Sequence, residues 1–256
     1  PAKTGRAGGR YDTLNFFYDL HLHSCLSPCA CDDMTPANVA AMCALAGLNV
    51  VALTDHNSTG NCAAFCEAAA RNGLLALPGM ELTTSEEIHV LCLLPDLDAA
   101  GAFGAMVRAR QPRVLNDSRI FGAQLYMDSE DALLGEEPQL LLTATDIGVY
   151  EVSALTAGYG GVAFPAHIDR PAFSLLSNLA LWDAALEFPL AECGRNCPAG
   201  FLSRRPDLRG VPIIYGSDAH SLDQIAQAAW SMELTGATAK NVLDWLRHHR
   251  KVYPAP

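Results

Sequence analysis

The sequence is short of positive charge. It has 17 Lys and Arg against 28 Asp and Glu, which gives a formal net charge of −11 and a pI near 5.0. Affinity for a nucleic-acid backbone comes largely from Lys and Arg, so this balance argues against a broad surface for extended nucleic acid. An acidic chain of this kind suits a protein that gathers divalent cations.

Long apolar runs are also missing. No stretch reaches the roughly 20 apolar residues of a membrane-spanning helix, and residues 1–10 lack the apolar segment of a signal peptide. We therefore expect no membrane partner. We interpret residues 1–14 as a flexible tail ahead of one domain over residues 15–256.

The nine cysteines include no Cys-x-x-Cys pair. Their odd number and the absence of an export signal favour reduced thiols and a cytoplasmic location. Cys25, Cys29 and Cys31 could bind a soft metal, as could Cys193 and Cys197. Because no spacing matches a known zinc or cluster motif, a cysteine metal site is the less favoured interpretation.

Short apolar strands alternate with helices along most of the chain. We predict strands at 15–21, 48–54, 74–77, 88–94, 161–165, 189–192, 211–215 and 231–234, and helices at 35–46, 62–71, 149–157 and 238–249. Repeated strand–helix units predict an α/β fold of parallel strands, either a barrel or an open sheet. Active residues of both collect at the carboxyl ends of strands.

Residues 96–145 break this alternation. The segment is largely polar, and we predict short strands at 124–127 and 139–143. We interpret it as an insertion after the fourth strand.

Five histidines follow the ends of predicted strands: His21, His23, His56, His167 and His220. Burying so many imidazoles without partners would cost several kcal/mol each. Neutral imidazoles and carboxylates are the ligand set of zinc, manganese and iron. The pattern therefore predicts a metal site with more than one ion.

Spacing supports the same prediction. His21 and His23 lie at i and i+2, so both side chains leave the same face of an extended chain. Asp218 and His220 repeat that spacing in another part of the chain, and Glu81 after Pro-Gly-Met can bridge two ions. His89 is the exception, because it stands near the start of its strand. It can join the site only if the loop at 81–87 curls over.

Taken together, these motifs resemble the PHP (polymerase and histidinol phosphatase) family of metal-dependent phosphoesterases. Seven segments occur in family order: Tyr18-Asp-Leu-His-Leu-His-Ser24, Met34-Thr-Pro36, Val51-Ala-Leu-Thr-Asp-His-Asn57, Pro78-Gly-Met-Glu81, Ile88-His-Val-Leu91, Pro165-Ala-His167 and Gly216-Ser-Asp-Ala-His220. The resemblance covers residues 18 to about 225. It implies a distorted (β/α)7 TIM-like barrel with a trinuclear metal site.

The resemblance also implies a ligand assignment. The first ion would take His21, His23, Glu81 and Asp218, the second Glu81, His89 and His167, and the third His56, His220 and an acidic residue after the first strand. The Ser-Asp-Gly that the family usually carries there is replaced by Ser27-Pro28. We favour Asp33 as the acid, with Asp32 as the open alternative.

The expected activity is hydrolysis of a phosphomonoester or phosphodiester of a small metabolite or nucleotide. A hydroxide bridging two or three ions would attack the phosphorus. Glu81, Asp218 and His220 are the candidate catalytic residues. Arg170 would grip the phosphate or pair with a loop acid, and Asn57 would bind substrate or cap its turn.

Two other functions remain open at this point. One is a nuclease that acts on DNA or RNA ends, as some relatives of the family do. The other is a non-catalytic, metal-stabilised binding or regulatory domain.

Overall fold

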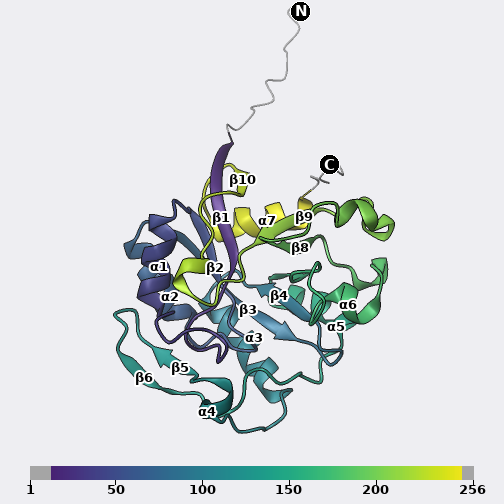
Figure 1. Ribbon diagram of the computed structural model, residues 1–256. Coiled ribbons are helices and arrows are strands. Elements are labelled where there is room, and N and C mark those ends of the chain that lie inside the picture. Colours follow the sequence, from purple (N-terminus) through teal and green to yellow (C-terminus); the bar gives the residue numbers. More distant parts are fainter. Residues whose placement is uncertain (1–12, 250–256) are drawn as a thin grey trace, which may run out of the picture.

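The computed structural model describes residues 13–249 (Figure 1). The expected tail at 1–14 therefore lies almost wholly outside the described residues, and Leu14 already begins a strand. The main sheet has the order β10-β1-β2-β3-β4-β7. Its strands are β1 (Leu14–Leu22), β2 (Val50–Leu53), β3 (Leu75–Thr83), β4 (His89–Leu93), β7 (Val162–Pro165) and β10 (Ser231–Leu234).

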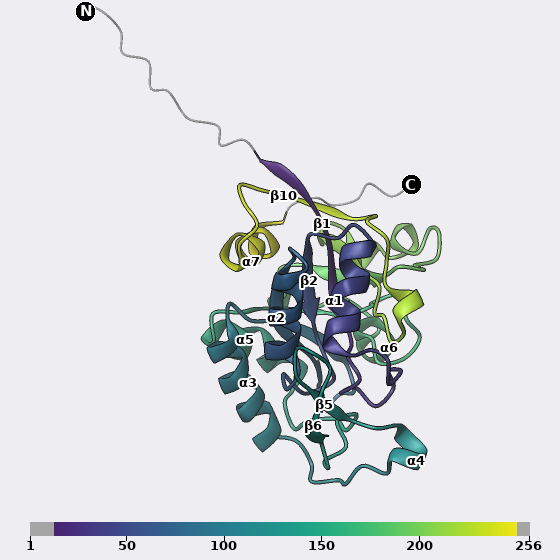
Figure 2. The same cartoon turned by 90° about the vertical axis from the view of Figure 1, so that its left-hand side faces the viewer.

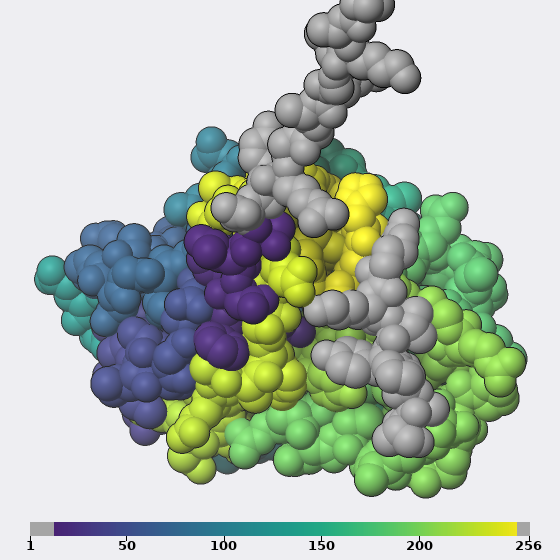
Figure 3. Space-filling model, turned by 90° about the horizontal axis from the view of Figure 1, so that it is seen from above, coloured from purple at the N-terminus to yellow at the C-terminus, as the bar shows by residue number. Residues whose placement is uncertain are grey.

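Strand direction is mixed. β1, β2 and β3 run parallel, as expected, whereas β4 is antiparallel to both β3 and β7. The C-terminal β10 pairs antiparallel with β1, so residues from opposite ends of the chain lie side by side (Figure 3). The uniform parallel sheet predicted from the alternation is therefore wrong at these two strands.

A second parallel pair completes the curled sheet. It consists of β8 (Ala191–Gly194) and β9 (Ile213–Gly216). The Ile168 amide after β7 donates to the Glu192 carbonyl of β8 (2.8 Å), and Leu22 of β1 bridges to Ala219 after β9. The α/β fold is confirmed in this curled form.

Helices cover the outside of the sheet. α1 (Pro36–Leu45) and α2 (Cys62–Arg71) pack together over β1 to β3 (Figure 2). The predicted start of α1 is confirmed: the Thr35 hydroxyl caps the Asn38 amide, and Pro36 takes the first helical position. α7 (Ala239–His248) packs its apolar side against Tyr18 and Leu20 of β1.

The segment at 96–145 is more regular than expected. It contains α3 (Leu97–Ala109), α4 (Ser118–Phe121) and a hairpin of β5 (Leu125–Met127) with β6 (Leu133–Glu136). The predicted strand at 139–143 is wrong, because side-chain amides of neighbouring residues bind the backbone there. The missed helix α3 has a signal in the sequence: Asp96 is its N-cap, and Ala100, Phe103 and Val107 form its buried stripe.

Two further helices follow in the second half of the chain. α5 (Val149–Gly158) packs against β7, and α6 (Leu175–Leu179) follows the loop after β7. Within residues 13–249, no helix is both long enough and apolar enough to cross a bilayer. All nine cysteines are free thiols.

Candidate metal centre

The end of β1 places two imidazoles on the same side of the chain. Asp19, His21 and His23 are fully buried on one face of the strand, while Leu20 and Leu22 pack into the apolar cores. The Nε2 atoms of His21 and His23 lie 3.2 Å apart. Each is also 3.1 Å from Asp218 Oδ1, which arrives from the loop after β9.

Glu81 lies at the middle of the cluster. Its Oε1 atom is 3.3 Å from His21 Nε2, and Oε2 is 3.2 Å from His23 Nε2. His89 Nδ1 and His167 Nε2 each approach Oε1 at 3.0 Å, and His56 Nδ1 approaches Oε2 at 3.1 Å. One buried carboxylate therefore contacts five imidazoles.

His89 reaches Glu81 because β4 is antiparallel. Thr83 at the end of β3 pairs with His89 at the start of β4, so the start of β4 lies where the parallel strands end. The turn is closed by a hydrogen bond from the Thr84 amide to the Ile88 carbonyl (2.9 Å). The expected curl of the loop at 81–87 is thus a hairpin turn.

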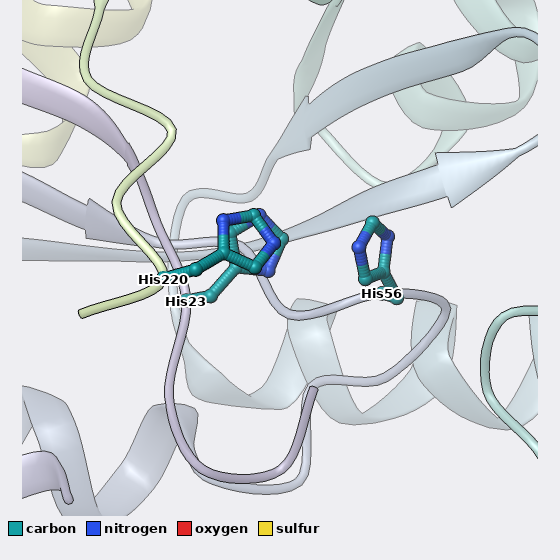
Figure 4. A group of neighbouring side chains, drawn as sticks. All are labelled: His23, His56 and His220. Atoms are coloured by element: carbon teal, nitrogen blue, oxygen red, sulfur yellow. The ribbon is translucent and has the colours of Figure 1, made fainter. Parts of the chain in front are cut away.

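The third group of imidazoles lies beside Glu81. His23, His56 and His220 offer ring nitrogens that all lie within 4.8 Å of one another. Figure 4 shows the rings of His23 and His220 one over the other, with 4.1 Å between ring centroids, and His56 to one side. The three side chains come from the loops after β1, β2 and β9.

The donor atoms fit divalent cations better than they fit one another. The Nδ1–H of His21 donates to Glu192 Oε1 (2.9 Å) and that of His23 to Ser27 Oγ (2.9 Å), so in the neutral rings the two Nε2 atoms face each other with lone pairs. Glu81 Oε2 and His56 Nδ1 are buried without a hydrogen-bond partner. Such atoms cost free energy unless a cation satisfies them.

Buried residues orient the rings of His21 and His23 by binding their Nδ1 atoms. Ser27 accepts from His23 and donates to Asp55 Oδ1 (2.7 Å), so Asp55 orients His23 through a hydroxyl. Glu192, in the middle of β8, is fully buried and binds both the His21 ring and the His167 amide. Outer partners of this kind set which ring nitrogen faces a metal.

Glu192 was not among the residues singled out from the sequence. A lone carboxylate in the apolar strand Leu190-Ala-Glu-Cys193 is the signal that could have found it, since such a residue is buried only with a partner.

Two predicted residues lie elsewhere. Asp33 is exposed, as is Asp32, and the structure brings neither carboxylate into the histidine groups. The Asn57 amide donates to the Leu141 and Thr143 carbonyls and accepts from the Thr83 amide. Asn57 therefore ties the segment after β6 to β3 rather than facing the cluster.

Arg170 lies at the opening of the cluster. Its guanidinium pairs with Asp218 Oδ2 at 2.5 Å, and the side chain is half exposed. Beside this pair lies a pocket of about 440 Å³, whose lining includes Arg170, Arg195, Asn196 and Ser217. The predicted phosphate-binding arginine is thus on the wall between the cluster and solvent, and the pairing with a loop acid is also present.

Site residues also carry unusual backbone angles. Asn57, His167 and Asp218 have positive φ values of 47°, 30° and 52°. This region is unfavourable for residues with a side chain, and it persists where the surrounding structure holds it. Each of these residues lies in the loop that follows a strand, namely β2, β7 or β9.

The histidines and carboxylates of the cluster shift one another's pKa values. Burial lowers the pKa of His23, but the hydrogen bond with Asp218 and the negative charges of Glu81 and Asp218 outweigh it and raise the pKa to about 9. The pKa of His21 is likewise raised, by the charges of Asp218, Glu192 and Glu81 against the effect of burial. Burial also disfavours ionised Glu81, yet the surrounding imidazoles hold its pKa well below the usual range.

His56 and His220 behave in the opposite way. Burial lowers the pKa of His56 well below its ordinary value. Burial and the neighbouring charge of His23 lower the pKa of His220 to about 4. These two rings are therefore neutral at pH 7 and ready to bind a metal, whereas His21 and His23 must first release protons.

Metal-free protein should lose stability between pH 6.5 and 9. A histidine whose pKa rises on folding stabilises the fold below its unfolded value of 6.5, and this contribution disappears as pH rises through about 9. For His23 the expected loss is on the order of 3 kcal/mol. Urea unfolding of chelator-treated protein at both pH values measures it. His23→Gln should flatten the profile, and a wild-type profile that is already flat would contradict the expectation.

Comparisons with known proteins find related sequences. A family model described as "PHP domain" matches residues 19–156, just over half of the chain. A 3',5'-nucleoside bisphosphate phosphatase from Chromobacterium violaceum is 36% identical over 110 residues. That match covers 42% of this chain and only 37% of the relative's length.

Two solved structures share the fold. A lesion-specific endonuclease from Pyrococcus furiosus has a TM-score of 0.68 at 17% identity, covering 92% of this chain and 56% of that one. A putative metal-dependent phosphoesterase from Bifidobacterium adolescentis has a TM-score of 0.56 at 21% identity, covering 79% of this chain and 87% of that one. At these identities the likeness concerns the fold alone.

Proposed function

Because the chain belongs to the PHP domain family, we propose that it is a metal-dependent phosphoesterase. Its substrate would be a phosphomonoester or phosphodiester of a small metabolite or nucleotide. The observation that carries the proposal is the Glu81 carboxylate, which is buried and contacts five imidazoles through its two oxygens. Such a carboxylate is suited to bridging metal ions.

The donors would hold two or three divalent ions of zinc, manganese or iron. One ion takes His21, His23, Glu81 and Asp218, which form one compact group. A second would take Glu81 with His89 and His167, which both contact Oε1, and a third would take His56 and His220. Asp33 is not retained as a ligand, because its side chain faces solvent.

The residues of the chain have distinct roles in this proposal. Bound divalent ions would lower the pKa of a water molecule and offset phosphoryl charge. Glu81 and Asp218 supply the negative charge that holds the ions, while Glu192 fixes the ring of His21. His220, neutral at pH 7 and only partly buried, offers a ring nitrogen to the third ion beside His23 and His56. Arg170, which pairs with Asp218 Oδ2, would bind the phosphate when bound ions offset the charge of that carboxylate.

Arg170→Ala should lower kcat/KM by about 10- to 100-fold, mainly through KM, because a charge-assisted hydrogen bond to phosphate is worth roughly 1.5–3 kcal/mol. Metal content should not change. The matched control is Arg209→Ala, which removes an exposed arginine away from the pocket. Steady-state kinetics on the same metal-loaded preparations gives the comparison, and an unchanged KM would remove Arg170 from the site.

Metal analysis combined with a phosphoester screen tests the proposed function. The panel should contain aryl mono- and diesters, sugar phosphates and a nucleoside 3',5'-bisphosphate, the last because of the name of the Chromobacterium relative. Phosphate release should depend on added metal and disappear in His23→Ala and Asp218→Ala. Metal-free protein, or activity indifferent to both substitutions, would reject the proposal.

A nuclease is the second candidate, since the fold is similar to that of the Pyrococcus endonuclease. The net charge of −11 counts against a broad nucleic-acid surface. Salt-dependent binding and cleavage of single strands would favour it over a small-molecule enzyme. Full metal occupancy with a specific ligand and no turnover on any ester would favour a non-catalytic binding domain.

We further propose that residues 15–256 form one domain, a distorted (β/α)7 barrel. Residues 96–145 would be an insertion that shapes substrate choice. Asn57 and Asn61 support this role, because their side chains tie the segment to the loop after β2.

A further inference from the structure

The side of β8 that faces away from the histidines carries a second set of metal-binding atoms. Side chains alternate along a strand, so Glu192 points to His21 and the next residue, Cys193, points into the apolar layer. There, the Sγ atoms of Cys193 and Cys197 and a carboxylate oxygen of Asp169 all lie within 4.8 Å of one another.

Backbone hydrogen bonds hold the three side chains in place. The Cys197 amide donates to the Gly194 carbonyl (3.0 Å), which closes a turn and returns the second thiol to the first. The Gly194 amide donates to Asp169 Oδ1 (2.7 Å), which fixes the carboxylate beside that turn. The Cys-x-x-x-Cys spacing matches no standard motif. The turn nevertheless brings both thiols and the Asp169 carboxylate together, so that three possible metal ligands lie in one place.

The two thiols are electrostatically unequal. A hydrogen bond with Cys197, together with burial, raises the pKa of the Cys193 thiol. The same hydrogen bond lowers the pKa of Cys197, which is half-buried. A thiol that gives up its proton readily is the form that binds metal.

We propose that Asp169, Cys193 and Cys197 bind one zinc-type cation at a site separate from the histidine centre. Two thiolates select a soft or borderline ion, and zinc accepts mixed sulfur and oxygen ligands in a tetrahedral arrangement. The fourth position would belong to water, since Asp169 and Gly194 also line the open pocket beside Arg170. An ion would enter from this pocket past Asp169 and Gly194.

A cation here would join two loops. Asp169 belongs to the loop after β7 that also carries His167 and Arg170, and Cys197 belongs to the loop after β8 that carries Arg195. Both arginines line the pocket. The proposed ion would therefore brace the wall that faces the substrate without touching the histidines.

Cobalt substitution distinguishes this site from the histidine centre. The full-length protein is stripped with a chelator, kept reduced and titrated with Co²⁺. Thiolate ligands give a near-ultraviolet charge-transfer band that histidine and carboxylate ligands cannot give. We expect the band in wild type and in His23→Ala, and its loss in Cys193→Ser and Cys197→Ser. Asp169→Asn should weaken Co²⁺ binding by at least about tenfold.

The controls cover the other cysteines and the risk of misfolding. Cys29→Ser and Cys31→Ser, both at exposed thiols, should keep the band. Cys197 is half-buried, so Cys197→Ser carries the test if the variant of the fully buried Cys193 does not fold. No band in wild type, a band that survives Cys197→Ser, or a band lost in His23→Ala or Cys29→Ser would overturn the proposal. None of these results depends on phosphoesterase activity.

Discussion

Glu81→Gln is expected to release bound metal and to lower kcat/KM by at least about 10²- to 10³-fold. The amide keeps the shape of the side chain, but it replaces one carboxylate oxygen with an NH₂ group that cannot bind a cation. Both Glu81 oxygens contact imidazoles that belong to different donor groups. The substitution should therefore disturb more than one ion at once.

Metal content by elemental analysis and kinetics on metal-loaded protein give the two readouts. Glu130→Gln is the matched control, since Glu130 is exposed. It should keep the metal content and the activity of wild type. Full metal occupancy in Glu81→Gln would show that this carboxylate does not bridge ions.

The second large effect is expected at Glu192. Glu192 is not one of the proposed metal ligands. It acts through His21, because its carboxylate accepts a hydrogen bond from the Nδ1–H of that ring (2.9 Å). Loss of the carboxylate charge in Glu192→Gln should lower metal affinity or activity by about 10- to 100-fold. The exposed Glu187 provides the control Glu187→Gln.

The pH dependence separates this positioning role from a structural one. The Glu192 charge helps to raise the pKa of His21, so the variant also reduces competition from protons at that ring. The loss of metal affinity should therefore be largest at alkaline pH and smaller near neutrality. A uniform loss at every pH, together with lower stability of the metal-free protein, would indicate a packing defect instead.

Residues at the ends of predicted strands were the most useful guide to the candidate site. The i, i+2 spacing of His21 and His23 and the position of His56 after a strand follow from local periodicity, and the structure brings these rings together. The boundaries of α2 were predicted to the residue, because Asn72-Gly73 ends the helix. Local signals of this kind do not depend on distant contacts.

The exposure of Asp33 and the direction of β4 could not be predicted from the sequence, because both depend on tertiary contacts. Asp33 faces outward because the loop after β1 is closed by hydrogen bonds from the Cys25 amide to the Met34 carbonyl and from the Cys31 amide to the His220 carbonyl, both 2.8 Å. The direction of β4, which explains His89, is set by its pairing with β3 and β7. Such pairing leaves no pattern in a single strand.

We propose above all that Glu81 lies between metal ions. Anomalous diffraction from crystals of the metal-loaded protein, recorded on both sides of the absorption edge of the metal, locates those ions. We expect at least two peaks within coordination distance of Glu81, one of them also within reach of His21, His23 and Asp218. A single peak away from Glu81, or none in this cluster, would contradict it.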